Sequence, residues 1–365
     1  MSRASWVRAV LVVGLATFAV VFGVRLGWMY VLGTFAGESY AHPAPGFWRW
    51  QPWIHPPVYG EYMRLLEAIS DRFWVGEELV AFWSGGVFAG VLGVLGALWA
   101  RREFGPGWDV AAALLLVFAA SNLRPFENYP PARTLIFGGV WMLFVLHRTP
   151  DASRARTLGT LAVLWTAVEL HLSSWFVLGP AWFFLAAADG RATERTKAHV
   201  RGIATWLVLF GLSTYPGLFR VLGEGPGEGR LGDGSVRWSH VTLEWTDVRL
   251  FLPLLLWLVP TLRRGRAPWV AASAAVVVYT LITWGLMAHN MAIGGPMRAS
   301  HHYFELIDPL LAMCALAALH AAWTHTDGWA RRVVGGATGV LILLHLVWYV
   351  RAFHLLREMS AGWTR

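Results

Sequence analysis

The sequence predicts an all-α protein built as a polytopic bundle of transmembrane helices, and three observations predict it. Of the 365 residues, 56% are hydrophobic and only 14% are charged, about half the charged fraction of a soluble domain. The mean hydropathy is +0.48, which favours lipid as the solvent of much of the surface. The chain also has 23 tryptophans, whose amphipathic rings favour the membrane–water interface.

Apolar runs that approach the roughly 20 residues of a membrane span recur along the chain. We expect about eleven spans, at residues 9–34, 77–99, 109–123, 133–148, 157–172, 175–189, 201–221, 249–262, 268–288, 303–323 and 333–354. The stretch 157–189 is interpreted as a tight helical hairpin that turns at Leu172–Ser174. No soluble domain and no clear repeat is apparent, so residues 1–365 are expected to form a single transmembrane domain.

The first apolar run follows a short basic segment, Met1–Arg8, and so resembles a secretory signal. The apolar pattern continues past Arg25 to about Phe35, which is long enough to cross a bilayer. We therefore interpret it as an uncleaved first helix, with cleavage after Ala36 as the alternative.

The distribution of charge predicts which side each segment faces. Basic residues gather in the short segments that are inside if the N-terminus is cytoplasmic, whereas acids prevail in the others, as the positive-inside rule requires. An odd number of spans then puts the C-terminus outside. The expected outer segments are residues 35–76, 124–132, 222–248 and 289–302. Within the first of them, 59–73 has helical periodicity and is expected to lie flat at the membrane interface, with Tyr62, Leu65, Leu66 and Ile69 on one face.

The net charge of +8 does not indicate nucleic acid as a partner, because the arginines cluster in short segments between apolar runs. Lys197 is the single lysine, a bias typical of a GC-rich bacterial source. Together with the apolar runs, this leads us to expect a multi-pass protein of the bacterial inner (plasma) membrane. The single cysteine, Cys314, excludes an intramolecular disulfide framework and is interpreted as a small buried hydrophobe.

The outer segment 35–76 holds the first candidate residues. Glu38 stands at the exit of the first span, where a carboxylate can act as a general base or remain a solvated acid. His55 is followed by two prolines, which hold it on an extended backbone. Together with His42 and Glu38 it could in principle bind a metal, but the spacing matches no tight metal motif. We therefore expect no cofactor, with a divalent cation as the open alternative.

Arginines on the expected outer side form a second group of candidates. Arg124 and Arg133 bracket the segment between the third and fourth spans, and Arg298 precedes His301 and His302. Anionic lipid headgroups explain any single one of them. For the set, we favour a lipid-linked phosphate or pyrophosphate, since the guanidinium fork matches phosphate oxygens.

Glu169 and His171 lie near the outer end of the fifth span. An ionisable group within a span is costly and suggests function. A structural partner for Glu169, an inward-facing Arg or His, explains it equally well.

Several short motifs resemble the GT-C superfamily of polytopic glycosyltransferases, especially its mannosyltransferase-like and aminoarabinose-transferase-like members. The first outer segment reads Gly37-Glu38-Ser39-Tyr40 and then His55-Pro56-Pro57-Val58-Tyr59. Asn128 to Val145 is similar to the family's hairpin between the third and fourth spans, and His302 to Leu310 is similar to the start of a late span.

The resemblance implies a membrane enzyme that takes a sugar from a polyprenyl-phosphate donor and transfers it to an acceptor on the periplasmic or extracellular face. Glu38 is then the catalytic base. The candidate substrate-binding residues are His55, Tyr59, Arg124, Arg133, His171, Arg298, His301, His302 and Tyr303. The other expected partners are membrane lipids.

Two alternatives remain open at this stage. One is a non-catalytic membrane protein, either a transporter of lipid-linked glycans or an assembly subunit; a transporter should show mid-span charges and internal repeats, and few are visible. The other is a membrane acyltransferase that uses His55, His171 or His302.

Overall fold

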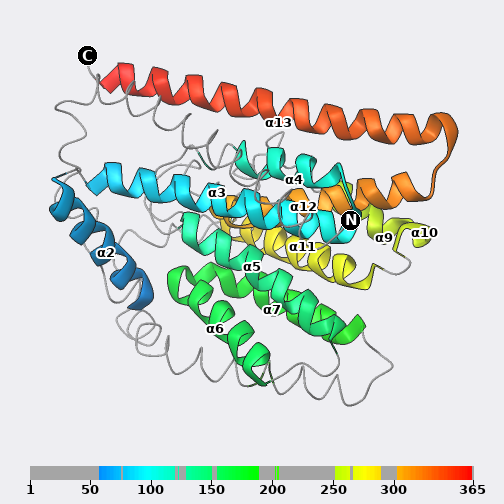
Figure 1. Cartoon of the computed structure of the whole chain (residues 1–365), viewed down its shortest axis with the longest axis horizontal. Helices are drawn as coiled ribbons and strands as arrows, with labels where there is room; N and C mark the ends of the chain where they lie inside the picture. The colour runs from blue at the N-terminus through cyan, green and yellow to red at the C-terminus, as the bar shows by residue number, and fades with distance from the viewer. Residues whose placement is uncertain are drawn as a thin grey trace. The chain divides into compact units, whose positions relative to one another are not determined.

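The computed structural model describes residues 57–74, 77–119, 122, 129–149, 154–188, 202, 204, 251–263, 266–288 and 302–363. Over these ranges the regular structure is helical and includes no strand (Figure 1). The prediction of an all-α, multi-span membrane protein is confirmed. The described helices divide between two compact units, and each has its own packing.

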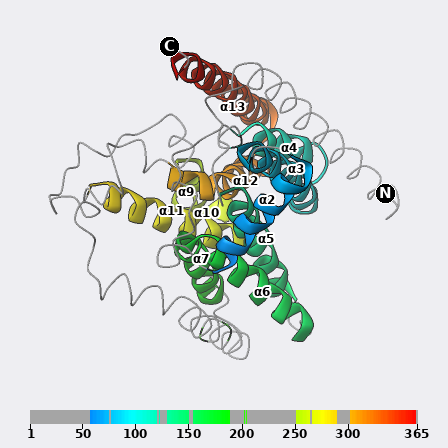
Figure 2. The same cartoon turned by 90° about the vertical axis from the view of Figure 1, so that its left-hand side faces the viewer.

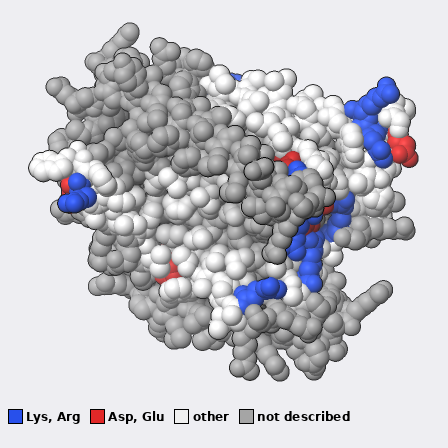
Figure 3. Space-filling view, in the orientation of Figure 1, with Lys and Arg blue, Asp and Glu red and all other residues white. Residues whose placement is uncertain are grey.

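Four described helices are long and apolar enough to cross a membrane, and they contain Ser84–Phe104, Ala267–Gly285, Phe304–Thr324 and Gly328–Arg351. Figure 3 shows that charged side chains on one face form a few small groups on an otherwise uncharged described surface. The number of eleven spans and the cytoplasmic N-terminus stay predictions, since the expected span 9–34 lies outside the described residues.

The first unit contains four described helices: α2 (Pro57–Phe73), α3 (Glu77–Phe104), α4 (Trp108–Val117) and α13 (Gly328–Trp363). Helix α2 occupies the stretch expected to be interfacial and packs on α3. The Tyr62 hydroxyl hydrogen-bonds the Ser84 hydroxyl. Leu66 and Ser70 follow on the same face of α2 and are buried, because residues four apart share a helix face. Leu65 is 56% exposed, so the packed face is narrower than the sequence pattern suggested.

The turn from α3 to α4 is tied by one carboxylate. Asp109 is buried, and its Oδ2 pairs with Nη1 of Arg101 at 2.7 Å. Its Oδ1 accepts hydrogen bonds from the backbone N–H groups of Gly107 and Val110. Gly107 has φ +92°, a conformation that glycine adopts without steric cost. This ion pair joins helices that lie side by side in both Figures 1 and 2.

Helix α13 is 36 residues long and touches its unit along a narrow stripe. Leu341 and His345 are buried, and the Tyr349 ring meets Phe118 edge-on at 5.4 Å. Only 11% of its apolar window is buried among the described residues. A long apolar helix with so much exposed surface is suited to lipid rather than water.

The second unit contains the rest: most of α5 (Tyr129–Arg148), α6 (Arg154–Leu170), η2 (Leu172–Ser174), α7 (Trp175–Ala188), α9 (Phe251–Leu258), α10 (Pro260–Arg263), α11 (Ala267–Ala288) and α12 (His302–Thr324). The 3₁₀ turn η2 joins α6 to α7, so the predicted hairpin turn at Leu172–Ser174 is confirmed. Gly139 of α5 allows a close approach, since a Cβ there would lie 2.8 Å from Cδ2 of Leu164 and 3.4 Å from Cδ2 of Leu178.

The expected span 249–262 is broken in the structure. Helix α9 ends at Leu258 and α10 starts at Pro260, with Val259 between them. Proline has no N–H to donate into the helix and disfavours helical geometry at the residue before it. The apolar pattern continues through this point and therefore did not reveal the break.

Three tryptophans lie in the protein core and do not present their rings to lipid headgroups. Trp99, Trp182 and Trp269 are all fully buried within their units. The ring of Trp269, near the start of α11, packs edge-on against Phe144 of α5 at 5.0 Å. Helix α11 also packs on α7, and the two are adjacent in both cartoon views (Figures 1 and 2). These rings therefore fill the core between helices.

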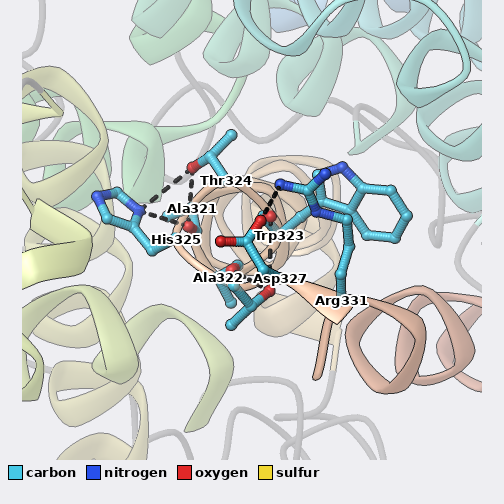
Figure 4. Close-up of polar contacts among 8 residues, drawn as sticks. Ala321, Ala322, Trp323, Thr324, His325, Asp327 and Arg331 are labelled. Atoms are coloured by element: carbon cyan, nitrogen blue, oxygen red, sulfur yellow. Dashed lines mark hydrogen bonds and ion pairs between the residues drawn. The ribbon is translucent and has the colours of Figure 1, made fainter. Parts of the chain in front are cut away.

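The turn between α12 and α13 is held by its own polar side chains (Figure 4). The Nδ1 atom of His325 lies 2.8 Å from the Ala321 carbonyl oxygen, and the Thr326 hydroxyl donates to the Ala322 carbonyl oxygen. Asp327 then pairs with Arg331 in the first turn of α13. Carbonyls at the end of α12 are thereby satisfied before α13 begins.

Candidate functional site

The structure describes some of the predicted site residues and not others. Five lie outside the described residues: Glu38, His55, Arg124, Arg298 and His301. Three lie on described helices without described side chains: Tyr59 on α2, and His302 and Tyr303 at the start of α12. Arg133 and His171 are described in full, and they belong to different units.

Arg133 is the most informative of these residues. It lies in the second turn of α5, and only 1% of the residue is exposed. Its neighbours along the helix, Ala132, Ile136 and Phe137, are fully buried. A guanidinium keeps its charge in proteins, and burying a charge costs free energy unless the protein supplies polar partners. The site therefore holds a permanent positive charge inside the protein.

Asn122 supplies one such partner. The Nη2 group of Arg133 donates a hydrogen bond to Oδ1 of Asn122. The amide Nδ2 of Asn122 in turn donates to the carbonyl oxygens of Leu116 and Val117, each at 2.7 Å. Since these are the last two residues of α4, Asn122 connects the end of α4 to the side chain of Arg133.

This amide also explains why α4 is shorter than the expected span 109–123. The chain leaves the helix at Phe118, and carbonyls at a helix end lack intrahelical partners. Backbone groups away from water must be satisfied by the protein. Asn122 does this from a position that the sequence pattern had placed inside the span.

The start of α5 adds to the positive character of the site. The first turn contains Pro130 and Pro131, which have no N–H groups to offer. The N-terminal end of a helix still carries a partial positive charge, and Arg133 adds a full one. The Thr134 hydroxyl in the same helix donates to the Pro130 carbonyl oxygen. The arrangement is suited to an anion with several oxygen atoms.

His171 lies at the turn between α6 and η2. Its Nδ1 accepts a hydrogen bond from the backbone N–H of Ser173 at 3.2 Å, so the proton of the neutral ring is on Nε2. The hydroxyl of Ser174 donates to the Ala167 carbonyl oxygen and closes the same turn. Glu169, two residues before His171, is buried. His171 thus has a structural role in the hairpin.

Sequence reasoning missed Asn122. The available signal was an asparagine at the end of an apolar run, where it commonly ends a helix. Among the described residues there is no group of three or more His, Cys, Asp or Glu side chains that could hold a metal ion. The histidines and the acid on which a metal site would depend, His42, His55 and Glu38, lie outside those residues, so the absence of a cofactor remains a prediction.

Comparison with known proteins gives matches among solved structures. No protein-family model and no curated protein matches the chain. The chain is similar to the structure of ArnT from Cupriavidus metallidurans bound to undecaprenyl phosphate, with 15% sequence identity and a TM-score of 0.49 over 98% of this chain and 73% of that chain. It is also similar to the apo state of the same protein, with 16% identity and a TM-score of 0.46 over 91% of this chain and 62% of that chain.

ArnT is a GT-C glycosyltransferase of the aminoarabinose-transferase type, the kind of protein that the sequence motifs resemble. The likeness concerns the arrangement of the helices alone. It assigns neither an activity nor a role to any residue of this chain.

Proposed function

We propose that this protein is a membrane glycosyltransferase that moves a sugar from a polyprenyl-phosphate donor to an acceptor on the outer face of the inner (plasma) membrane. The observation that carries the proposal is the burial of Arg133 at the start of α5, with its guanidinium bonded to Asn122. The motifs around Glu38 and His55 support the same reading.

The burial of Arg133 separates two explanations of the outer arginines. An arginine that only contacts lipid headgroups would lie at the protein surface and gain little from burial. Arg133 is enclosed and held by an amide that is itself buried. Enclosure excludes water and strengthens an interaction with a phosphate. A specific phosphate site is therefore the better account of this residue.

In the proposed reaction, an acceptor hydroxyl or amine attacks the anomeric carbon of the donor sugar. The acceptor loses its proton to the carboxylate of Glu38, and a new bond forms to that carbon. The bond from the carbon to the phosphate oxygen breaks, and its electron pair leaves with the polyprenyl phosphate. Arg133 would stabilise the charge that develops on the phosphate, with Arg124 and Arg298 as further candidates.

The first test measures binding of undecaprenyl phosphate to the full chain in lipid nanodiscs. Arg133→Gln should weaken binding by roughly 10- to 100-fold, the loss expected when a hydrogen bond from a charged group is removed. Arg133→Lys keeps the positive charge but lacks the guanidinium fork. Its affinity for undecaprenyl phosphate should lie between those of the unmodified chain and Arg133→Gln. Arg72→Gln is the matched control, because Arg72 is exposed on α2. An equal loss in the Arg72 variant would mean that headgroup attraction alone explains binding.

The second test measures sugar transfer from synthetic polyprenyl-phosphate sugars. Glu38→Gln should abolish transfer while leaving lipid binding unchanged, because it removes only the proton acceptor. Retained transfer in a folded Glu38→Gln protein would eliminate the assignment of this base. Binding of the lipid phosphate without transfer by the unmodified protein would favour the carrier or assembly-subunit alternative.

A further inference from the structure

Asn122 contacts two groups of opposite charge. One is the end of α4, where carbonyl oxygens carry partial negative charge. The other is the guanidinium of Arg133. The orientation of the amide follows from these neighbours: Nδ2 must face the carbonyls of Leu116 and Val117, and Oδ1 must face the N–H donor. A flipped amide would put like partners against each other on both sides.

We propose that Asn122 is a positioning residue that fixes the guanidinium of Arg133 for recognition of a lipid-linked phosphate. This inference rests on the proposed function and names a further residue of the same site. Three hydrogen bonds hold the amide, two at 2.7 Å to carbonyls and one to Arg133. The backbone N–H of Asn122 adds a fourth, to the Ala119 carbonyl oxygen at 2.8 Å. A side chain held by these hydrogen bonds has few accessible rotamers. It therefore restricts the orientation of the guanidinium that is bonded to it.

The chemistry of the partner matters as much as its rigidity. An amide oxygen accepts from the guanidinium and leaves its positive charge in place, whereas a carboxylate at the same position would neutralise it. Hydrogen bonds in a chain polarise one another, so the carbonyls at the end of α4 make the amide oxygen a better acceptor. The contact with Asn122 therefore orients Arg133 without placing a negative charge beside it.

The test compares undecaprenyl phosphate with neutral undecaprenol, in nanodiscs, for the unmodified chain, Asn122→Ala, Arg133→Gln and the double variant. The ratio of the two affinities reports on the phosphate and is insensitive to a general loss of stability. Asn122→Ala should weaken binding of the phosphate lipid about tenfold, by the worth of a hydrogen bond to a charged group, and leave undecaprenol unchanged. In the Arg133→Gln background, Asn122→Ala should cause no further loss, because the two residues act as a unit.

Asn122→Ser is a second variant for the case in which the alanine protein does not fold, since its hydroxyl can still donate to a carbonyl at the end of α4 but is too short to replace the amide oxygen that faces Arg133. It should lower the preference for the phosphate lipid, because the guanidinium loses its positioning partner. The positioning role would be overturned if either Asn122 variant kept the preference of the unmodified chain for the phosphate lipid. It would also be overturned if Asn122→Ala weakened phosphate-lipid binding equally in the unmodified chain and in Arg133→Gln. The proposed function fails in a different way: the unmodified protein would then show no preference for the phosphate lipid, or a preference that Arg133→Gln does not alter.

Discussion

At the scale of single residues, burial carries more information here than residue type. Arginine replaces lysine almost throughout the chain, with Lys197 as the single exception, so the presence of an arginine at a given position says little about the need for a guanidinium fork. Arg133 differs from the exposed Arg72 and Arg332 because it is enclosed by protein. Moving a charged side chain from water into the protein costs free energy, whereas leaving it at the surface does not. A structural or functional gain must offset that cost for Arg133.

Tyr62 allows a prediction about alkaline pH. Burial raises the pKa of Tyr62, and the hydrogen bond with Ser84 opposes that shift. An unfolded tyrosine loses its proton near pH 10, while the folded protein retains it to higher pH. The free energy of unfolding should therefore fall as the pH rises above about 10.

Tyr62→Phe should make the thermal unfolding midpoint in detergent less sensitive to pH between about 9 and 11. Ser84→Ala is the informative companion, because it removes the hydrogen bond but keeps the phenol, and the pKa of Tyr62 should then rise further. Absorbance of tyrosinate gives an independent titration. A Tyr62→Phe protein with the same pH profile as the unmodified chain would contradict the assignment.

At the scale of helices, adjacent glycines on α5 allow a matched comparison. A Cβ at Gly139 would meet Cδ2 of the buried Leu164 at 2.8 Å, whereas a Cβ at Gly138 would meet nothing within 4 Å. Gly139→Ala should destabilise the protein by about 1–3 kcal/mol through overpacking. Gly138→Ala should be neutral or stabilising by up to about 1 kcal/mol, because alanine favours a helix. Unfolding midpoints in detergent measure both, and equal effects would show that the approach of α6 to Gly139 is not tight.

Hydrophobic pattern was sufficient to predict most of the described helices. The expected spans 133–148 and 268–288 correspond to α5 and α11, whose described bounds differ from them by only a few residues. The failures share a physical cause. Around Asn122 and at Val259, the chain stays apolar while the helix stops, because a side-chain amide or a proline changes the backbone hydrogen bonding. Hydropathy does not register either event.

The candidate site was predictable only in part for a related reason. Arg133 was found because a charge beside an apolar run is conspicuous in a sequence. Asn122 was missed because its role depends on where the end of α4 meets the side chain of Arg133, 11 positions away in sequence. A hydrophobic pattern along the sequence does not show which residues distant in sequence contact each other in the folded protein. The role of Asn122 depends on such a tertiary contact.

At the scale of the whole molecule, the proposed function depends on orientation in the membrane. The positive-inside rule gives the orientation from charge alone. In that orientation Glu38 and the start of α5 face outward, and the α12–α13 turn with Asp327 faces the cytoplasm. In an inverted protein Glu38, the proposed base, would face the cytoplasm and could not reach an acceptor on the outer face.

The single cysteine makes that orientation measurable. Cys314 is fully buried in α12, so the unmodified chain should not react with a membrane-impermeant maleimide. Asp327→Cys introduces a thiol where the side chain is 96% exposed and should be labelled only after the membrane is permeabilised. Ser235→Cys, in the expected outer segment 222–248, should be labelled in intact spheroplasts. The reverse pattern would place Glu38 in the cytoplasm, and transfer to an outer acceptor would no longer be tenable for this chain, whatever its affinity for a lipid phosphate.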